Sequence, residues 1–227
     1  MNRCPLVPLP AAGMTKYYDV HMFISRRAKH LVPDLASERL LLRQLTARDE
    51  AEWINLRYAN AKWLKPWDPT SPLGPPESMT FREMLRARDE SAIDGSGYSW
   101  ALALPQLHRG RPPLIGQVSV SSVQYGAART ASIGYWIDRN HAGFGLMPEA
   151  CALVIDHCFE QLQLHRLEIN IRPENAASLR VVDKLGFRDE GLRVGYLHID
   201  GQWRDHRTFA LTREELKTPM LERIYEY

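Results

Sequence analysis

The sequence has few cysteines and no long hydrophobic run, and each shortage excludes a class of protein. The three cysteines, Cys4, Cys151 and Cys158, are odd in number and widely spread. They do not suit the disulfide framework of a small secreted domain. No stretch reaches the roughly 20 apolar residues that a membrane-spanning helix needs. We therefore expect reduced thiols, no membrane association and a cytoplasmic location.

The sequence also lacks an excess of charge. Its 29 basic and 27 acidic residues leave a net charge of +2, whereas proteins that bind nucleic acid along its phosphates show a strong basic excess. We expect no direct nucleic-acid partner. With 227 residues, 44% hydrophobic and 25% charged, the chain is long enough for one substantial globular domain. The sequence does not distinguish a monomer from a homodimer.

The chain divides by pattern into three parts. Residues 1–34 mix prolines with basic residues and show no periodicity, so we interpret them as an N-terminal arm. Residues 35–215 carry regular patterns and form the folded domain, and residues 216–227 are a C-terminal tail. No spacing of histidine, cysteine and carboxylate residues is typical of a metal site, so we predict no metal.

Within the domain, the hydrophobic period alternates between that of strands and that of helices. A helix after Thr46 should bury Trp53, Leu56 and Tyr58, and Asn175 and Gly186 are typical helix caps. Asp200-Gly201 is a strong hairpin signal. The pattern predicts an α/β fold with one mixed sheet, with strands over 38–43, 99–104, 114–123, 131–138, 166–172, 195–200 and 203–212, and helices over 77–89, 148–162 and from 175.

A glycine turn follows the strand 131–138. Gly143 and Gly145 would let the backbone approach a ligand closely, and the free N–H groups of the helix that follows attract anions such as a pyrophosphate. The turn lacks the third glycine of a dinucleotide fingerprint and the Gly-Lys-Ser/Thr of a P-loop. A plain tight turn has the same sequence, so the pattern alone leaves both interpretations open.

Seven segments together resemble the GNAT superfamily and, within it, the RimJ/RimL group of protein N-terminal acetyltransferases. Taken singly, Asn175, Ser178 and Gly186 have ordinary structural roles in capping and turns; it is the combination that carries the resemblance, which covers residues 37 to about 212. The segments are Ser37–Arg43 (SERLLLR), Leu64–Pro69 (LKPWDP), Ile133–Trp136 (IGYW), Gly143–Met147 (GFGLM), Pro173–Ser178 (PENAAS), Lys184–Phe187 (KLGF) and Ile199–His206 (IDGQWRDH).

The resemblance implies a GNAT acyl-CoA N-acyltransferase fold, in which two splayed parallel strands, here 131–138 and 166–172, hold acetyl-coenzyme A. The sequence departs from the family at Asn140, where relatives often carry Arg or Gln, and Arg139 then has to supply the positive charge. The implied cofactor-binding residues are Ile137, Ala142, Gly143, Phe144, Gly145, Leu146, Met147, Asn175 and Ser178.

The resemblance leaves the proton transfers partly unassigned. Many relatives use a tyrosine as the acid and a glutamate as the base, and this chain has Val182 and Asn170 at those positions. Ser178 is then the expected catalytic donor to the leaving thiolate. Glu168 and Asp138 are candidate bases, or simply solvated surface carboxylates. Trp67 and Tyr135 are the expected substrate-binding residues, although Trp67 could instead pack on the core and anchor its loop.

The expected reaction transfers an acetyl group from acetyl-coenzyme A to a primary amine. At pH 7 deprotonation costs about 1 kcal/mol for an α-amine and about 4.6 kcal/mol for a lysine, so a site with a weak base suits the N-terminal α-amine of a protein. Two alternatives stay open: an acetyltransferase of small amines such as aminoglycosides, polyamines or amino acids, and a degenerate coenzyme A-binding module without turnover.

Overall fold

Eight strands pair into one mixed sheet in the order β1-β2-β3-β4-β5-β6-β8-β7. The structure is a computed structural model that describes residues 31–74, 79–105 and 111–226. All neighbouring strands are antiparallel except β5 and β6. The strands are β1 (Leu35–Ala36), β2 (Leu41–Arg43), β3 (Tyr98–Ala103), β4 (Leu114–Gln124), β5 (Thr130–Ile137), β6 (Arg166–Ile171), β7 (Arg188–Ile199) and β8 (Gln202–Thr212).

Helices cover both faces of the sheet. On β3, Trp100 and Leu102 point into the larger core with α4, α5 and α6, whereas Ala101 and Ala103 point into a smaller core with α1 and α3. This alternation follows from the two-residue period of a strand. The helices are α1 (Glu50–Ala59), α2 (Ala61–Leu64), α3 (Phe81–Asp94), α4 (Leu146–Glu160), α5 (Ala176–Leu185) and α6 (Met220–Tyr225), with short 3-10 helices at Ala47–Asp49, Arg139–His141 and Arg213–Glu215.

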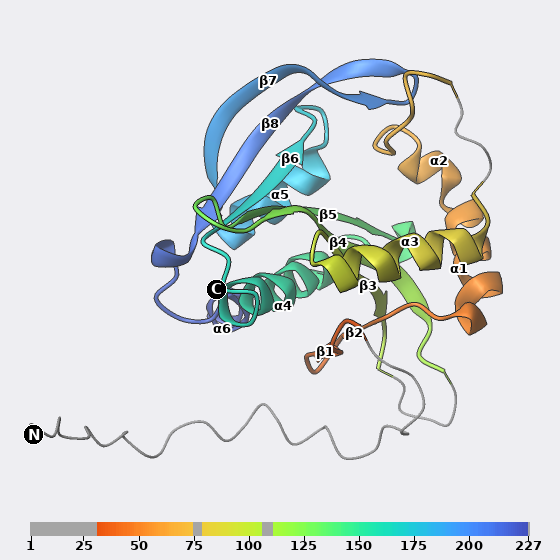
Figure 1. The fold of residues 1–227 in the computed structure, drawn as a ribbon, viewed down its shortest axis with the longest axis horizontal. Helices are drawn as coiled ribbons and strands as arrows, with labels where there is room; N and C mark the ends of the chain where they lie inside the picture. The colour runs from red at the N-terminus through yellow and green to blue at the C-terminus, as the bar shows by residue number, and fades with distance from the viewer. Residues whose placement is uncertain (1–30, 75–78, 106–110, 227) are drawn as a thin grey trace, which may run out of the picture. The chain divides into compact units, whose positions relative to one another are not determined.

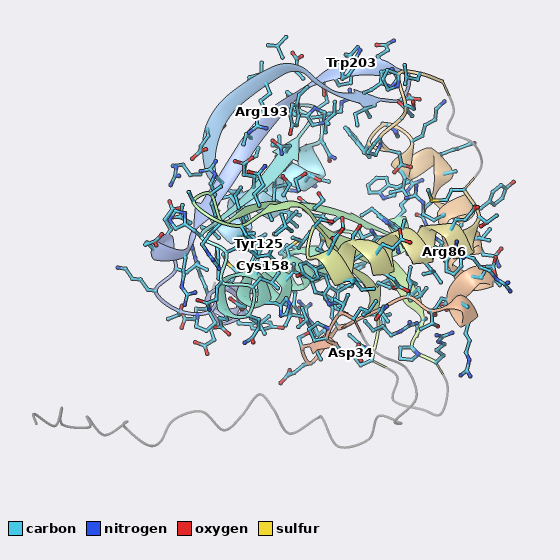
Figure 2. The ribbon with its side chains drawn as sticks, viewed as in Figure 1. Asp34, Arg86, Tyr125, Cys158, Arg193 and Trp203 are labelled. Atoms are coloured by element: carbon cyan, nitrogen blue, oxygen red, sulfur yellow. The ribbon has the colours of Figure 1, made fainter. Side chains whose placement is uncertain are left out.

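Helix α4 is the central element of the larger core. Cys151, Val154, Ile155 and Cys158 are all fully buried, as expected for a helix that packs along a sheet and touches two further helices. Both of these cysteines are free, as predicted, and Cys158 is labelled on α4 in Figure 2. Cys4 lies outside the described residues. No helix among the described residues is both long and apolar enough to cross a membrane.

The parallel strands β5 and β6 pair only where they begin. Their ladder contains Thr130 with Arg166, Ala131 with Leu167 and Ser132 with Glu168, and it stops there. Beyond that point β5 stays with β4 and β6 stays with β8, so the two strands diverge (Figure 1). The expectation of splayed parallel strands is confirmed.

The order of the main elements also agrees with the sequence pattern, with two corrections. Tyr58, which we expected to be buried, is 84% exposed, while Trp53 is buried. Five residues advance a helix by about 140°, which turns Tyr58 away from the side that Trp53 buries. Strand β7 begins at Arg188, earlier than the expected residue 195. Asp200 and Gly201 have φ of 46° and 78°, as a two-residue hairpin turn requires.

The ends of the described chain belong to the core. Val32 is 3% exposed, and the carbonyl oxygen of Pro33 accepts a 2.9 Å hydrogen bond from Trp100 Nε1. In the expected tail, Met220 and Ile224 of α6 are buried. A short apolar segment at a terminus docks when it covers exposed core surface. Residues 1–30 of the expected arm lie outside the described residues, and the division into arm, domain and tail stays a prediction.

Asp156 of α4 holds the start of α6. Its carboxylate oxygens accept hydrogen bonds from the backbone N–H groups of Met220 at 2.6 Å and Leu221 at 3.0 Å. Burial nevertheless raises the pKa of Asp156 to about 6, because desolvation of the charged form outweighs these two bonds.

This raised pKa predicts a pH-dependent stability. Between the ordinary carboxyl pKa, about 3.9, and about 6, the folded chain binds a proton that the unfolded chain does not, so this contribution falls as pH rises through that window. Asp156→Asn should abolish it. Urea unfolding of both proteins at pH 5 and pH 7 should show a stability gain on acidification that is about 1 kcal/mol larger for the unchanged chain.

Glu90→Gln is the matched control, because Glu90 is an exposed helical carboxylate on α3 and is not among the groups that shift the pKa of Asp156. It should keep the pH dependence of the unchanged chain. The same pH dependence in Asp156→Asn as in the unchanged chain would contradict the assignment.

Candidate active site

A cleft of about 1200 Å³ opens where β5 and β6 diverge. Pockets for one small ligand are typically about 300–1000 Å³, so this cleft has room for an extended ligand and a second molecule. Its walls come from β5, β6, the glycine turn, the start of α5, the loop after α2 and the β7–β8 hairpin. It is lined by the expected residues Trp67, Tyr135, Ile137, Ala142, Gly143, Phe144, Gly145, Met147, Asn175 and Ser178.

Leu146 is the one expected site residue whose side chain does not line the cleft. It is 8% exposed and belongs to the larger core. As the first residue of α4, it anchors the helix while its backbone stays at the turn. Only its N–H group could therefore meet a ligand.

The glycine turn has the backbone that its sequence predicts. Gly143 and Gly145 have φ of 89° and 77°, in the left-handed region that side chains with a Cβ avoid. A Cβ built on Gly143 would have no heavy atom within 4 Å, so its face of the turn is open. Gly145 caps α4 without any side-chain hydrogen bond. The first turn of α4 therefore presents N–H groups to the cleft without a capping side chain.

A buried carboxylate fixes this turn from behind. Glu149 is fully buried and accepts hydrogen bonds from Ser37 Oγ at 2.5 Å and Tyr225 Oη at 2.6 Å. It also forms an ion pair with Arg39, whose Nη1 donates to the carbonyl oxygen of Phe144 at 3.2 Å. Sequence reasoning assigned no role to Glu149, because its three partners are distant in the chain.

Asp138, at the end of β5, is engaged on both carboxylate oxygens. Asn60 Nδ2 donates to Oδ1 at 2.8 Å and His141 Nδ1 lies 2.6 Å from Oδ2. Although burial opposes it, these hydrogen bonds hold the pKa of Asp138 below its usual range. Asp138 is only 6% exposed, so the alternative of a solvated surface carboxylate is wrong, and its engaged oxygens make it a poor base.

Glu168, the other candidate base, is also ion-paired with neighbouring side chains. It lies between Arg166 at 2.9 Å and Arg193 at 3.1 Å, and its side chain does not line the cleft. The two positions at which relatives carry an acid and a base hold side chains here that do not titrate, and of the two only Asn170 lines the cleft. Val182 is buried in the core, and Asn170 Oδ1 accepts a 2.8 Å hydrogen bond from Thr208.

Ser178 is placed by the start of α5. Asn175 caps the helix through a 3.1 Å hydrogen bond from the Ser178 N–H group, as its sequence predicts. Tyr135 on β5 donates its hydroxyl to the carbonyl oxygen of Ser178 at 3.4 Å. Burial raises the pKa of Tyr135 well above its usual range, so the phenol is neutral. These contacts join β5 to α5 across the opening between β5 and β6.

Trp67 is half-buried and belongs to neither apolar core. The guanidinium carbon of Arg172 lies 5.3 Å from the centre of its ring, and Arg172 Nη1 donates to the carbonyl oxygen of Pro66 at 2.7 Å. The hairpin end of β7–β8 holds the same loop through a 2.9 Å hydrogen bond from Thr70 N to His198 O. Figure 2 shows Trp203 near this end of the ribbon and Arg193 farther along it.

The structure adds a cleft residue to which sequence reasoning assigned no catalytic role. His206 on β8 lines the cleft and is 3% exposed, with Nδ1 3.0 Å from the carbonyl oxygen of Arg204. Across the described ranges, no three histidine, cysteine or acidic side chains are grouped as a metal would need. The signal that could have found His206 is its place in the segment Ile199–His206, which closes the cleft.

Comparison with known proteins assigns this site to a family. The acetyltransferase (GNAT) domain matches residues 39–188, a segment that includes β5, the glycine turn, β6 and α5. The chain belongs to the GNAT family of acetyltransferases. It is therefore an acyltransferase that takes an acetyl group from acetyl-coenzyme A.

Individual relatives support the same family assignment. The ribosomal protein uS5-alanine N-acetyltransferase of Escherichia coli is 33% identical over 182 residues, which are 78% of this chain and 90% of that protein. A protein of Bacillus subtilis named "Probable N-acetyltransferase YjcK" is 45% identical over 98 residues, which are 43% of this chain and 54% of YjcK. The structure of Mycobacterium smegmatis RimJ in complex with CoA-disulfide superposes with a TM-score of 0.74 at 33% identity, covering 86% of this chain and 92% of that one.

Proposed function

We propose that this chain acetylates the N-terminal α-amine of a protein. The observation that carries the proposal is the state of the carboxylates in the cleft. Among the described residues that line it, the acidic ones are Asp68 and Glu174. Asp68 pairs with Arg57 at 2.7 Å and Glu174 pairs with Arg172 at 3.2 Å. Each of these carboxylates is therefore ion-paired with an arginine, and neither stands alone in the cleft.

A weak base matches an acceptor that is easily deprotonated. At pH 7 an α-amine loses its proton for about 1 kcal/mol, whereas a lysine requires about 4.6 kcal/mol. The difference of about 3.6 kcal/mol corresponds to more than two orders of magnitude in the fraction of neutral amine. An N-terminal α-amine is therefore the acceptor that this cleft favours.

The relatives support the same class of acceptor. The Escherichia coli protein is named for the alanine of ribosomal protein uS5, and it aligns with this chain over 90% of its own length. The Mycobacterium smegmatis structure is a RimJ protein bound to a coenzyme A disulfide. A ribosomal protein that begins with a small residue is the first acceptor to test.

The residues of the glycine turn fit a pyrophosphate. We place acetyl-coenzyme A along β5 at Ile137, with its pyrophosphate on the backbone from Ala142 to Met147 and its acetyl end near Asn175 and Ser178. Open space at Gly143 and the uncapped start of α4 support this placement. Because Asn140 stands where relatives often carry Arg or Gln, Arg139 would supply the positive charge of this turn, as the resemblance implies.

Ser178 is the proposed donor of the proton that the departing sulfur takes up. It lies in the first turn of α5 and lines the cleft, and a hydroxyl there can donate to a developing thiolate. Trp67 and Tyr135 are the proposed acceptor-side residues. Trp67, held by Arg172, would cover the first residues of a bound peptide, and Tyr135 would supply a neutral hydroxyl.

A panel of acceptors tests the proposal. Peptides that begin with alanine, serine or methionine, N-terminally blocked peptides that contain lysine, spermidine and an aminoglycoside would each be incubated with acetyl-coenzyme A and analysed by mass spectrometry. We expect acetylation of an unblocked peptide α-amine. Turnover of small amines alone would establish the small-amine alternative, and no product from any acceptor would favour the degenerate binding module.

Trp67→Ala tests whether Trp67 binds the acceptor peptide. It should raise KM for the peptide by about tenfold, about 1.4 kcal/mol, because the indole is a binding surface and not part of either core. KM for acetyl-coenzyme A and the melting temperature should stay nearly unchanged. A lower melting temperature with unaltered peptide KM would show that Trp67 only anchors its loop.

Gly143→Val tests the phosphate assignment. The side chain would fill the open face of the turn and strain its positive φ, so calorimetry should show acetyl-coenzyme A binding at least about tenfold weaker. Gly126→Val is the matched control, because Gly126 has a φ of 71° and equally open surroundings but lies away from the cleft. Equal affinities in the two folded variants would remove the glycine turn from the site.

Ser178→Ala tests the proton donor. A donor that acts mainly on the leaving group stabilises the transition state, so kcat should fall by about tenfold or more while acetyl-coenzyme A affinity stays the same. Ser91→Ala, on the outer helix α3, should leave both unchanged. A kcat within about twofold of the unchanged enzyme, under about 0.4 kcal/mol, would exclude Ser178 as the proton source.

A further inference from the structure

The cleft contains a buried imidazole that the preceding assignments do not use. His206 lies on β8 one residue before Arg207, and Arg207 pairs with Ile171 at the carboxyl end of β6. His206 therefore sits beside the end of β6, where β5 and β6 have already separated. It lines the cleft although only 3% of its surface is exposed.

The contacts of His206 fix its tautomer. Its Nδ1 lies 3.0 Å from the carbonyl oxygen of Arg204, and a carbonyl oxygen can only accept a hydrogen bond. Nδ1 therefore carries the proton, and in the neutral ring Nε2 keeps a free lone pair. The ring of Tyr196 packs edge-on against the imidazole, with centroids 5.8 Å apart, and holds its orientation.

The surroundings of His206 keep the ring neutral. Burial lowers the pKa of His206, the hydrogen bond to Arg204 raises it, and the charge of Arg172 lowers it again, while Glu174 and Asp205 act in the raising direction. Arg193 faces His206 from the neighbouring position on β7. The net pKa lies below the ordinary histidine value, so the imidazole is a base rather than a cation at pH 7.

We propose that His206 is the general base of the acetyl transfer. Its Nε2 takes one proton from the acceptor ammonium, directly or through one water, and so generates the neutral amine. The amine nitrogen then forms the bond to the acetyl carbon, and the carbon–sulfur bond breaks. The second excess proton of the nitrogen passes to the sulfur through the Ser178 hydroxyl, and the imidazolium returns its proton to solvent.

The inference rests on the proposed cleft as the site of transfer, and not on which amine is the acceptor. It supplies the base that neither Glu168 nor Asp138 can provide, because both are held by other side chains. A neutral imidazole is a weaker base than a lysine amine. It therefore agrees with an acceptor of low pKa.

His206→Asn removes the proposed basic nitrogen but can keep the hydrogen bond to Arg204. The amide nitrogen of Asn can still donate to the Arg204 carbonyl oxygen, but the lone pair of Nε2 is lost. With a peptide that begins with alanine, kcat/KM at pH 7 should fall by about 100-fold. The defect should shrink to about threefold near pH 9.5, where solvent deprotonates the amine. Added imidazole should restore part of the activity at pH 7.

His165→Asn is the matched control, because the His165 side chain is 52% exposed, pairs with Glu214 and lies outside the cleft. It should match the unchanged enzyme at every pH. For each variant, KM for acetyl-coenzyme A and the melting temperature are also measured, so that a loss of cofactor binding or of folding can be recognised. If His206→Asn does not fold, His206→Gln, which retains the length of the imidazole without a basic nitrogen, should show the same pH-dependent defect.

Two outcomes would overturn the assignment: a defect of the same size at pH 7 and pH 9.5, which indicates a structural role, or a kcat/KM within about twofold of the unchanged enzyme at pH 7. An unchanged enzyme that does not acetylate the alanyl peptide would instead refute the proposed acceptor. The same comparison with spermidine as the acceptor then decides the role of His206.

Discussion

The incomplete pairing of β5 and β6 is the constraint on which the rest of the site depends. Their ladder ends at Ser132 and Glu168, and beyond it each strand has backbone N–H and C=O groups on the edge that faces the opening. Backbone groups away from water need partners, so an extended ligand with amide groups can take the place of the missing strand. The glycine turn and the start of α5 both face the same opening.

The strands β5 and β6 are kept apart because each is attached to a different neighbouring part of the fold. Trp63 Nε1 donates to the carbonyl oxygen of Ile137 at 3.1 Å, and Asn60 joins α1 to Asp138, so the end of β5 is tied to the first helices. On the other side β6 is paired along its length with β8. The buried Glu149 then connects the glycine turn to both ends of the described chain, through Ser37, Arg39 and Tyr225.

The electrostatics of the cleft restrict what it can do chemically. Arginine partners hold both lining carboxylates, and burial keeps Tyr135 and His206 neutral. Three cationic side chains, Arg172, Arg180 and Lys184, also line the cleft, so its charge favours a ligand that carries phosphates. The cleft can exchange protons through neutral hydroxyl and imidazole groups, which suits the acetylation of an amine that already loses its proton near neutral pH.

The sequence by itself determined the features that depend on local chemistry. The Asn175 cap, the positive φ of Gly143 and Gly145 and the Asp200-Gly201 turn follow from backbone preferences of single residues, and the α/β class follows from alternating periods. The seven family segments added the prediction of which residues bind the cofactor. These properties need no knowledge of distant contacts, and so a single sequence was enough to predict them.

Only the tertiary structure decided which polar groups are free to act. Asp138 and Glu168 have the same chemistry as a catalytic carboxylate, but Asn60, His141, Arg166 and Arg193 occupy them. His206 has the same chemistry as any surface histidine, yet it is buried at the cleft against Tyr196, and its Nδ1 is hydrogen-bonded to Arg204. The physical reason is that burial and hydrogen-bond partners set proton affinity, and those partners come from residues far apart in the chain.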